Sequence, residues 1–577
     1  MSYKILGKSV NRVDAIAKVT GKAKYAEDYF EREMLVGKVL RSTYAHAKIK
    51  NIFIDDALSL DGVEAVITYK DLPNIRFATA GHPYSLDKNH RDVEDRLMLT
   101  NKARYVGDAI AAVIAKDEII AQKALKLIKV DYDILDAVFN TEDAIAEGAP
   151  IIHEDKPNNI IASSKIEIGD INEEFKNADY VFEGEYETSI VQHCQLECQN
   201  AYAYVDENNR IVIVTSTQIP HIVRRIVGQA LNIPIGRIRV IKPFVGGGFG
   251  NKQDVIIEPL TAAMTLAVNG RPVRLSLDRE EVFASTRTRH AMKYKIRTAI
   301  SKDGKLLAIS MNNQVNNGAY ASHGHSIAMS AASKFRPLYS FKAIEVKPTT
   351  VYTNLPTAGA MRGYGIPQVC FALESHLDDI AIKLNMDPIK FRENNFISLG
   401  YEDPLSGIKV RSFGVKECIK KGKDLIRWDE KKKRYKNITG NKRRGVGMAC
   451  FSYFSGTYPV SLEIAGARIV MNQDGSVQLQ VGATEIGQGS DTIFSEMVAE
   501  VLGIDIEKVN VISIQDTDIT PFDTGAYASR QSFVTGAAVK KAAKEVKNKV
   551  LEIASRKCGL NIDELDIREG IIIEKNG

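Results

Sequence analysis

Long apolar segments are missing from this sequence, which limits where the protein can work. The apolar run Ala109–Ala115 has seven residues, far short of the roughly 18 that a membrane span requires. The first residues, Met1 to Lys4, do not read as a signal peptide. We therefore expect no membrane partner and a cytoplasmic location.

Clustered cysteines, metal-binding histidine motifs and excess charge are scarce as well. The six cysteines are scattered, as is typical of a reducing compartment, and Cys194 and Cys198 have no second pair with which to hold iron–sulfur or zinc. No HExxH motif occurs, and we interpret His323-x-His325 as a loop feature rather than a metal site. A net charge of +5 over 577 residues, with basic runs that lack interleaved aromatics, argues against a nucleic-acid partner.

Dinucleotide and P-loop fingerprints are also missing. Neither G-x-G-x-x-G nor G-x-x-x-x-G-K-[ST] occurs in the sequence. If the protein is a redox enzyme, any flavin, NAD or iron–sulfur centre must therefore lie on another chain. The 44% of hydrophobic residues and the length of 577 residues are typical of a globular protein of about three domains.

The most concentrated feature that is present is the stretch Pro243 to Gln253, P-F-V-G-G-G-F-G-N-K-Q. It lies between a strand predicted over 237–241 and a helix predicted over 255–268. Glycine loses much backbone entropy on folding, so such a cluster indicates positive φ or close approach of the backbone to another body. A cofactor cradle at a helix N-terminus and a tight turn without a ligand are both open on these residues alone.

An internal repeat suggests two related lobes. Residues 227–241 align without gaps to residues 498–512, and six aliphatic residues coincide at the same offsets. Each copy follows a loop with a glutamine, Gln218 or Gln488, and precedes another loop. We expect a ligand between the lobes; the alternative is that helix–turn–strand units often look alike.

Five loops combine small residues with uncharged donors, at 216–218, 246–253, 359–368, 484–492 and 527–531. Glutamine both donates and accepts hydrogen bonds, which suits the edge of a heterocycle or an oxo group. Arg362, between Met361 and Gly363, suits a phosphate or a carbonyl. Together the loops favour a large, polar, partly heterocyclic ligand, although each loop alone is compatible with a solvated turn.

Three ordered motifs carry a family resemblance: G-G-G-F-G-x-K at 246–252, A-x-R-G-[FY]-G-x-P-Q at 360–368 and G-Q-G-x-x-T at 487–492. With the opening at 7–25, they resemble the molybdopterin-binding subunit of the xanthine dehydrogenase/aldehyde oxidase family. The resemblance implies an α+β and α/β fold. A small α/β hammerhead domain at 18–130 would precede a two-lobed mixed α/β molybdopterin-binding domain, with lobes at 150–410 and 440–577, the second incomplete.

The resemblance implies a molybdenum–molybdopterin cofactor, either plain or in the cytosine dinucleotide form. The positions that match cofactor contacts are Gln218, Gly247, Gly248, Phe249, Arg362, Gln488, Ala528 and Ser529. Around the metal, acting through the cofactor, would lie Gln218, Phe249 and Arg362. Phe249 and Gln253 would face the substrate.

The function implied is hydroxylation of a purine, hypoxanthine or xanthine, at a carbon next to a ring nitrogen. Electrons would pass to [2Fe-2S] and FAD partner subunits in a hetero-oligomer. Another N-heterocycle such as nicotinate, an aldehyde or carbon monoxide, and a non-catalytic pterin-binding scaffold or truncated fragment are the alternatives. Purine-specific relatives often carry Glu where Gln253 stands and Arg near Ser330; Lys334, one helical turn on, is a candidate replacement cation.

The resemblance implies that the family's general-base glutamate lies beyond Gly577, in a Gly-Glu-Pro motif that this sequence does not contain. We therefore expect no catalytic base within residues 1–577 and no hydroxylase activity from this chain alone. The last residues, 570–577, read as a strand entering a hairpin whose partner strand is missing. The charged stretch 428–444 reads as a surface linker.

Overall fold

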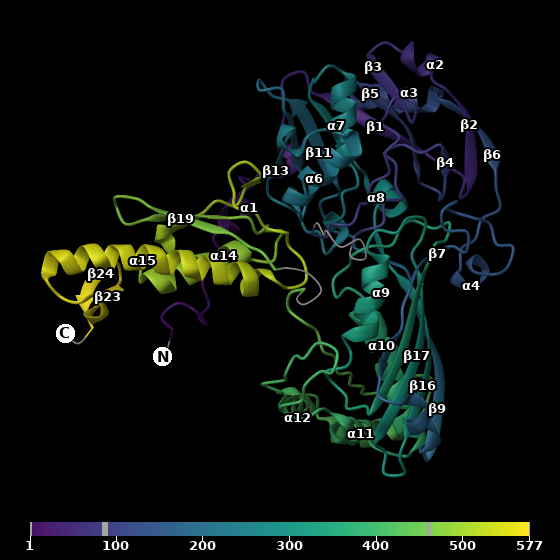
Figure 1. The fold of residues 1–577 in the computed structure, drawn as a ribbon, viewed down its shortest axis with the longest axis vertical. Coiled ribbons are helices and arrows are strands. Elements are labelled where there is room, and N and C mark those ends of the chain that lie inside the picture. Colours follow the sequence, from purple (N-terminus) through teal and green to yellow (C-terminus); the bar gives the residue numbers. More distant parts are fainter. Residues whose placement is uncertain (1–2, 84–90, 458–462, 576–577) are drawn as a thin grey trace.

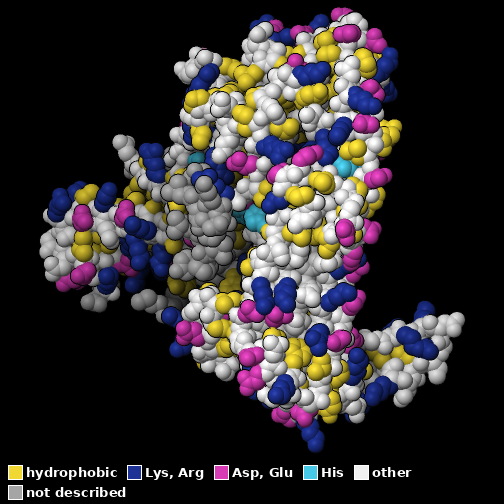
Figure 2. Space-filling view, turned by 45° about the vertical axis from the view of Figure 1, so that its right-hand side comes forward, with side chains coloured by type: hydrophobic (Ala, Val, Ile, Leu, Met, Phe, Trp, Pro, Cys, Tyr) yellow, Lys and Arg dark blue, Asp and Glu magenta, His cyan; other side chains and the backbone are white. Residues whose placement is uncertain are grey.

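The structure, a computed structural model, describes residues 3–83, 91–457 and 463–575 (Figure 1). No helix within these ranges is long and apolar enough to cross a membrane. The six cysteines all lie in described segments and are free thiols. Basic and acidic side chains are interspersed over the face shown in Figure 2.

A mixed eight-stranded sheet lies in the upper part of Figure 1. Across the sheet, the strands are β22 (Gln515–Asp516), β13 (Ile238–Lys242), β12 (Ile211–Thr215), β11 (Asn200–Val205), β14 (Val273–Ser276), β1 (Leu35–Arg41), β5 (Ala109–Ala115) and β3 (Val63–Thr68). β1 runs parallel to β14, with Leu35 opposite Val273. The region predicted as a hammerhead therefore shares its sheet with the first lobe.

Helices cover this sheet, in which β5 and β12 are buried along their whole length. All seven residues of β5 are buried, as in other strands enclosed between layers. α3 (Glu118–Leu127) packs on β1. The Asp117 side chain caps the N-terminus of this helix. α6 (Pro220–Leu231) and α7 (Glu258–Ala267) pack on the first-lobe strands. A small sheet of β4 (Lys102–Ala103), β2 (Ala47–Phe53) and β6 (Lys129–Ile134) flanks the hammerhead.

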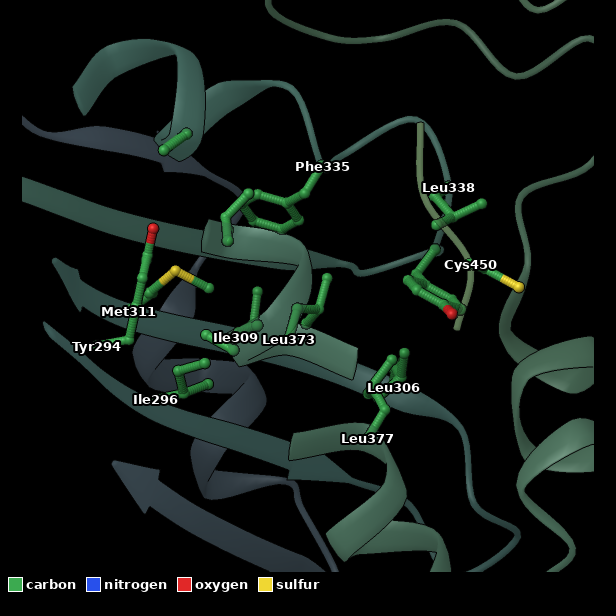
Figure 3. Close-up of a cluster of buried hydrophobic side chains, with 14 of the residues drawn as sticks. Tyr294, Ile296, Leu306, Ile309, Met311, Phe335, Leu338, Leu373, Leu377 and Cys450 are labelled. Carbon is green, nitrogen blue, oxygen red and sulfur yellow. The ribbon is translucent and has the colours of Figure 1, made fainter. Parts of the chain in front are cut away.

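A second large sheet extends downward in Figure 1 and completes the first lobe. Its strands are β7 (Ile160–Ser163), β18 (Ala343–Val351), β17 (Leu306–Asn316), β16 (Ala291–Ile300) and β9 (Tyr180–Thr188), with β8 (Ile166–Ile168) also on β18. α9 (Gly324–Ser333), α10 (Ile366–Lys383) and α11 (Pro388–Asn395) lie against it. Figure 3 shows side chains of alternate strand residues, such as Tyr294 and Ile296, facing Leu373 and Leu377 of α10.

The second lobe stands apart at the left of Figure 1. Its sheet of β19 (Ala467–Met471), β20 (Val477–Val481) and β21 (Val509–Val511) packs against α14 (Ser490–Leu502) and α15 (Gly536–Cys558). The short strand β22 leaves this lobe to join the first-lobe sheet, where Gln515 pairs with Lys242. The two lobes are thus joined by backbone hydrogen bonds as well as by side chains.

The repeat predicted from the sequence is confirmed as two β–α–β units. In the first lobe, β12, α6 and a 3₁₀ turn (Ile235–Arg237) lead to β13, which runs parallel to β12. In the second lobe, β20, α14 and a 3₁₀ turn (Ile506–Lys508) lead to β21, which runs parallel to β20. Both glutamine loops therefore lie at the carboxyl end of the first strand of a unit, where open α/β sheets bind ligands.

One sequence-based prediction holds in part and another is wrong. The charged stretch 428–444 lies mostly at the surface, as predicted, but it begins with α13 (Trp428–Lys436), and Trp428 is 4% exposed because its ring packs into the core with α10. The strand β24 (Ile571–Glu574) has a partner, β23 (Leu565–Arg568), which runs antiparallel to it and precedes it in the chain.

The prediction about the general base concerns a position that the structure does not reach. Gly577, beyond which the family's glutamate is expected, lies outside the described residues, which end at Lys575. The position of that glutamate therefore stays a prediction.

Candidate functional site

Gln218 joins three of the predicted site loops. Its Oε1 accepts a hydrogen bond from the backbone N–H of Gly250 at 3.0 Å, and its Nε2 donates to the carbonyl of Ala526 at 2.6 Å. Its own carbonyl accepts from the hydroxyl of Thr484 at 2.9 Å. The glycine loop of the first lobe and two loops of the second lobe therefore meet at one buried glutamine.

A Cβ would meet close neighbours where these loops touch. A Cβ on Gly248 would lie 2.4 Å from Gln218 Oε1, and one on Gly525 would lie 2.6 Å from the Gln218 carbonyl. Gly250 has φ +109°, and its Cβ would lie 2.5 Å from the carbonyl of Ala360. The glycines thus serve loop-to-loop contact inside the protein, which is the close backbone approach that their clustering indicates.

A buried ion pair supports the glycine loop from below. Glu197 Oε2 accepts from the backbone N–H of Gly246 and from Lys252 Nζ, each at 2.7 Å. The Lys252 side chain has no exposed surface, and its burial lowers the pKa of its ammonium group. Lys252 of the glycine motif therefore anchors the loop. Sequence reasoning missed Glu197, because nothing in its local pattern ties it to a loop some fifty residues away.

Phe249 and Arg362 lie together at the surface of the site. The Phe249 carbonyl accepts from the backbone N–H of Arg362 at 2.8 Å. Phe249 has φ +54° and is 45% exposed, an unusual conformation and setting for an aromatic residue. The exposed Arg362 guanidinium makes no hydrogen bond or ion pair with any other residue in the described ranges. A free cation next to an exposed ring suits an anionic or carbonyl-bearing heterocycle.

Gln488 shapes its own loop. Its Nε2 donates to the Thr484 carbonyl at 2.9 Å and to Gln531 Oε1 at 2.5 Å, and its Oε1 accepts from the N–H of Ile486 at 2.7 Å. The residue is exposed, so it lies at the rim of the site.

Ala528 and Ser529 are two consecutive residues in the left-handed region, with φ +51° and +52°. Such backbone is strained without glycine and is found preferentially at ligand sites. The next residue, Arg530, holds the strained pair in place. Its buried guanidinium pairs with Asp523 at 2.6 Å and with Glu463 at 2.7 Å.

The predicted substrate residues lie in different settings. Gln253 is 5% exposed, and its amide has no hydrogen bond to another described residue. Ser330 and Lys334 are one turn apart on α9, as predicted, since the Lys334 N–H donates to the Ser330 carbonyl. Burial lowers the pKa of Lys334, and its Nζ lies 5.5 Å from the centroid of the Tyr453 ring. Lys334 thus has a cation–π partner, and its role towards substrate stays a prediction.

The residues present fit a large polar cofactor. Two buried polar atoms in the converging loops, Gln195 Oε1 and Ser216 Oγ, have no hydrogen-bond partner among the described residues. Buried polar atoms are nearly always paired, so such a group of orphans indicates a ligand or water. Together with strained loops and a free arginine, they form a donor-rich surface around Gln218.

Comparison with known proteins identifies the family. A model described as molybdopterin cofactor-binding domain matches residues 152–396, a second model of that description matches residues 421–577, and the aldehyde oxidase and xanthine dehydrogenase a/b hammerhead domain matches residues 20–136. The putative xanthine dehydrogenase molybdenum-binding subunit XdhA of Escherichia coli K12 is 50% identical over 544 residues, which are 94% of this chain and 72% of that protein. The chain belongs to the xanthine dehydrogenase/aldehyde oxidase family of molybdenum hydroxylases.

Other relatives share the fold. The nicotinate dehydrogenase large molybdopterin subunit of Eubacterium barkeri is 34% identical over 73% of this chain and 96% of its own length. Quinoline 2-oxidoreductase from Pseudomonas putida 86 superposes with a TM-score of 0.89 at 26% identity, over 100% of this chain and 74% of that one. Aldehyde oxidoreductase from Desulfovibrio gigas gives 0.84 at 28% identity, over 94% of this chain and 60% of that one. The predicted fold class, a hammerhead followed by molybdopterin-binding lobes, is confirmed.

Proposed function

We propose that this chain is the molybdenum subunit of a purine hydroxylase that acts on hypoxanthine or xanthine at a carbon next to a ring nitrogen. The observation that carries the proposal is the convergence on Gln218 of loops from both lobes, with Phe249 and Arg362 exposed beside it. The 50% identity to the Escherichia coli xanthine dehydrogenase subunit favours a purine.

The chain's own residues would bind and orient the cofactor and the substrate. When bound, molybdenum–molybdopterin supplies the oxygen-transfer and two-electron chemistry of hydroxylation. Gln218 has a second N–H on Nε2 to direct at an oxygen of the cofactor, and Arg362 offers a charge that no described side chain neutralises. Phe249 presents an aromatic face to a planar ring, and Gln253 has a neutral amide for a ring edge.

The cofactor contacts predicted at Gly247, Gly248, Gln488, Ala528 and Ser529, and the cytosine dinucleotide form, are part of this proposal. So are [2Fe-2S] and FAD partner subunits, which are favoured by the lack of dinucleotide fingerprints here. A reducing, cytoplasmic compartment stays a prediction. Metal and nucleotide analysis of the purified complex checks the cofactor form and the partner cofactors.

Residues 1–577 contain no Gly-Glu-Pro motif, and we propose that these residues alone do not turn over substrate. Loaded with cofactor and supplied with electron acceptors, a protein of these residues should bind molybdenum and show no hydroxylase activity. Full turnover would overturn this part of the proposal while leaving the cofactor site intact.

Hydroxylation of nicotinate is the second candidate. Where purine-specific relatives often carry Glu and Arg, this chain has the neutral Gln253 and the small Ser330, and a nicotinate dehydrogenase subunit is among its relatives. The test is steady-state assay of the complete complex with hypoxanthine, xanthine, nicotinate, quinoline and benzaldehyde. We expect the highest kcat/KM for a purine, by at least about tenfold, which corresponds to about 1.4 kcal/mol of transition-state binding. A higher value for nicotinate would replace the first candidate with the second.

A matched pair of variants tests the aromatic contact. Phe249→Leu should raise KM for the preferred heterocycle, whereas Phe53→Leu, at a similarly exposed ring at the end of β2, should leave it unchanged. Equal KM values for the two variants would remove Phe249 from the substrate site.

A further inference from the structure

Three side chains with metal-binding chemistry meet next to the Arg362 loop, at a place that the predicted molybdopterin contacts do not use. His82 and Asp92 come from the hammerhead region, and His325 lies in the first turn of α9. One donor atom from each lies within 4.8 Å of the donor atoms of the other two. Two imidazoles and one carboxylate are the ligand set of open three-ligand zinc sites.

His82 and Asp92 are in direct contact, with the carboxylate facing a ring nitrogen. Asp92 Oδ1 lies 2.5 Å from His82 Nδ1, whereas the other ring nitrogen of His82, Nε2, lies 2.9 Å from the Tyr364 hydroxyl. If the Nε2 proton is donated to Tyr364, Nδ1 turns a lone pair towards the carboxylate. Either a proton or a metal ion must then separate the two acceptors.

His325 has no hydrogen-bond partner among the described residues. Its Nδ1 is buried and unpaired, and its Nε2 lies 3.7 Å from Asp92 Oδ1, too far for a hydrogen bond. A cation between His325 Nε2 and the Asp92 carboxylate would give this ring a partner at Nε2, which a proton shared by His82 and Asp92 does not supply. Nδ1 keeps no partner among the described residues.

An ordered shell orients the cluster. His323 Nδ1 lies 3.1 Å from His82 Nε2 and 2.9 Å from the Tyr364 hydroxyl, and His323 Nε2 lies 3.0 Å from Asp254 Oδ1. Asp254 is in turn held by Arg287 and Ser322. Metal-binding histidines characteristically have their second ring nitrogen held in this way.

We propose that His82, Asp92 and His325 bind one divalent transition-metal ion, with Zn²⁺ as the ion that best suits two imidazoles and a carboxylate. Its three ligands are not among the residues predicted to contact molybdopterin, and the proposal does not rest on the proposed function. Its ion would link the hammerhead region to α9, next to Tyr364, and would leave a coordination position open for water. The interpretation of His323-x-His325 as a mere loop feature is revised accordingly: His325 is the ligand, and His323 supports His82.

The test is metal binding by the purified protein, with its partner subunits where they co-purify. After dialysis against chelator, Zn²⁺ is titrated by calorimetry, and Co²⁺ is added as a spectroscopic probe. We expect one Zn²⁺ per chain in addition to molybdenum, and visible Co²⁺ bands of low-coordinate geometry. His325→Gln and the isosteric Asp92→Asn should each weaken Zn²⁺ binding by more than about tenfold, because loss of a ligand exceeds loss of an outer-shell partner.

His46→Gln is the matched control, since His46 is a buried hammerhead histidine that also has one unpaired ring nitrogen and lies outside the cluster. It should bind Zn²⁺ like the wild-type chain. Far-UV circular dichroism and melting curves confirm that the variants are folded. Absence of a zinc site in the wild-type protein, or equal affinity of His325→Gln and His46→Gln, would overturn the proposal and leave a proton between His82 and Asp92.

Discussion

The two β–α–β units share a topology and differ in their surroundings. In both, a glutamine loop follows the first strand, and the helix ends at a left-handed residue, Asn232 with φ +55° or Gly503 with φ +70°. The first unit lies inside an eight-stranded sheet, whereas the second lies in a three-stranded one. Gln218 is consequently buried, at 2% exposure, and Gln488 is exposed. Topology thus places a loop at the site, and the surrounding layers decide whether its glutamine is a central support or a rim residue.

The helix ends offer the largest expected effect. Asn232→Ala should lower stability by about 1–2 kcal/mol, the cost of left-handed backbone for a residue with a Cβ. Gly503→Ala should cost more, because its Cβ would lie 2.0 Å from the carbonyl of Ile567. Melting temperatures by differential scanning fluorimetry should therefore fall further for Gly503→Ala.

Asn232→Gly is the control for that pair and should melt close to the wild-type chain. If Gly503→Ala melts no lower than Asn232→Ala, the packing of β23 against the end of α14 contributes less to stability than the geometry indicates.

The glycines on either side of Gln218 come next. Gly248→Ala meets only the end of a flexible side chain, so it should displace the Gln218 amide and lower molybdenum content without unfolding the protein. Gly525→Ala, at φ +126° and against backbone, should lower both molybdenum content and melting temperature. Gly236→Ala, which faces open space, should change neither. Molybdenum content that is unchanged in Gly248→Ala would separate Gln218 from the cofactor site.

Lys242 connects the two units and predicts a pH dependence. Its buried Nζ donates to the Glu485 carbonyl at 3.0 Å, and burial lowers its pKa to about 8. An unfolded lysine keeps its proton up to about pH 10.4, so the unfolded state binds more protons between pH 8 and that value, and stability rises with pH in this window. The melting temperature of wild type relative to Lys242→Met should increase from pH 8 to pH 10. A constant difference would show that folded Lys242 keeps its proton over this range, as the unfolded lysine does.

The smallest effect is expected at the strained pair in the second lobe. Ala528→Gly should relieve left-handed strain and raise the melting temperature slightly, by the equivalent of about 1 kcal/mol or less. Ala526→Gly, at a buried residue outside the left-handed region, should lower it by a similar amount. Equal shifts in melting temperature for the two variants would mean that the left-handed backbone at Ala528 carries no measurable strain.

Local requirements explain which parts of the site could be predicted. The glycine loop, Gln218 and Arg362 could be predicted from short segments. In these segments the residue type depends on the local backbone conformation or on hydrogen-bond donor chemistry. Glu197 below the loop, the pairing of β22 with β13, and the meeting of His82 with His325 involve partners far apart in the chain, for which no local pattern exists. The burial of Trp428 was not predicted, because one apolar residue followed by several lysines gives the whole stretch a charged, surface-like composition.

The sequence by itself determined the repeated β–α–β units, the glycine positions and the supply of uncharged donors, since backbone freedom and hydrophobic periodicity act within a few residues. Tertiary structure alone decided which donors face one another, because burial and desolvation depend on layers brought together from distant segments. It buried Gln218 between the lobes, left the Arg362 guanidinium without a partner among the described residues, and placed a carboxylate between two histidines.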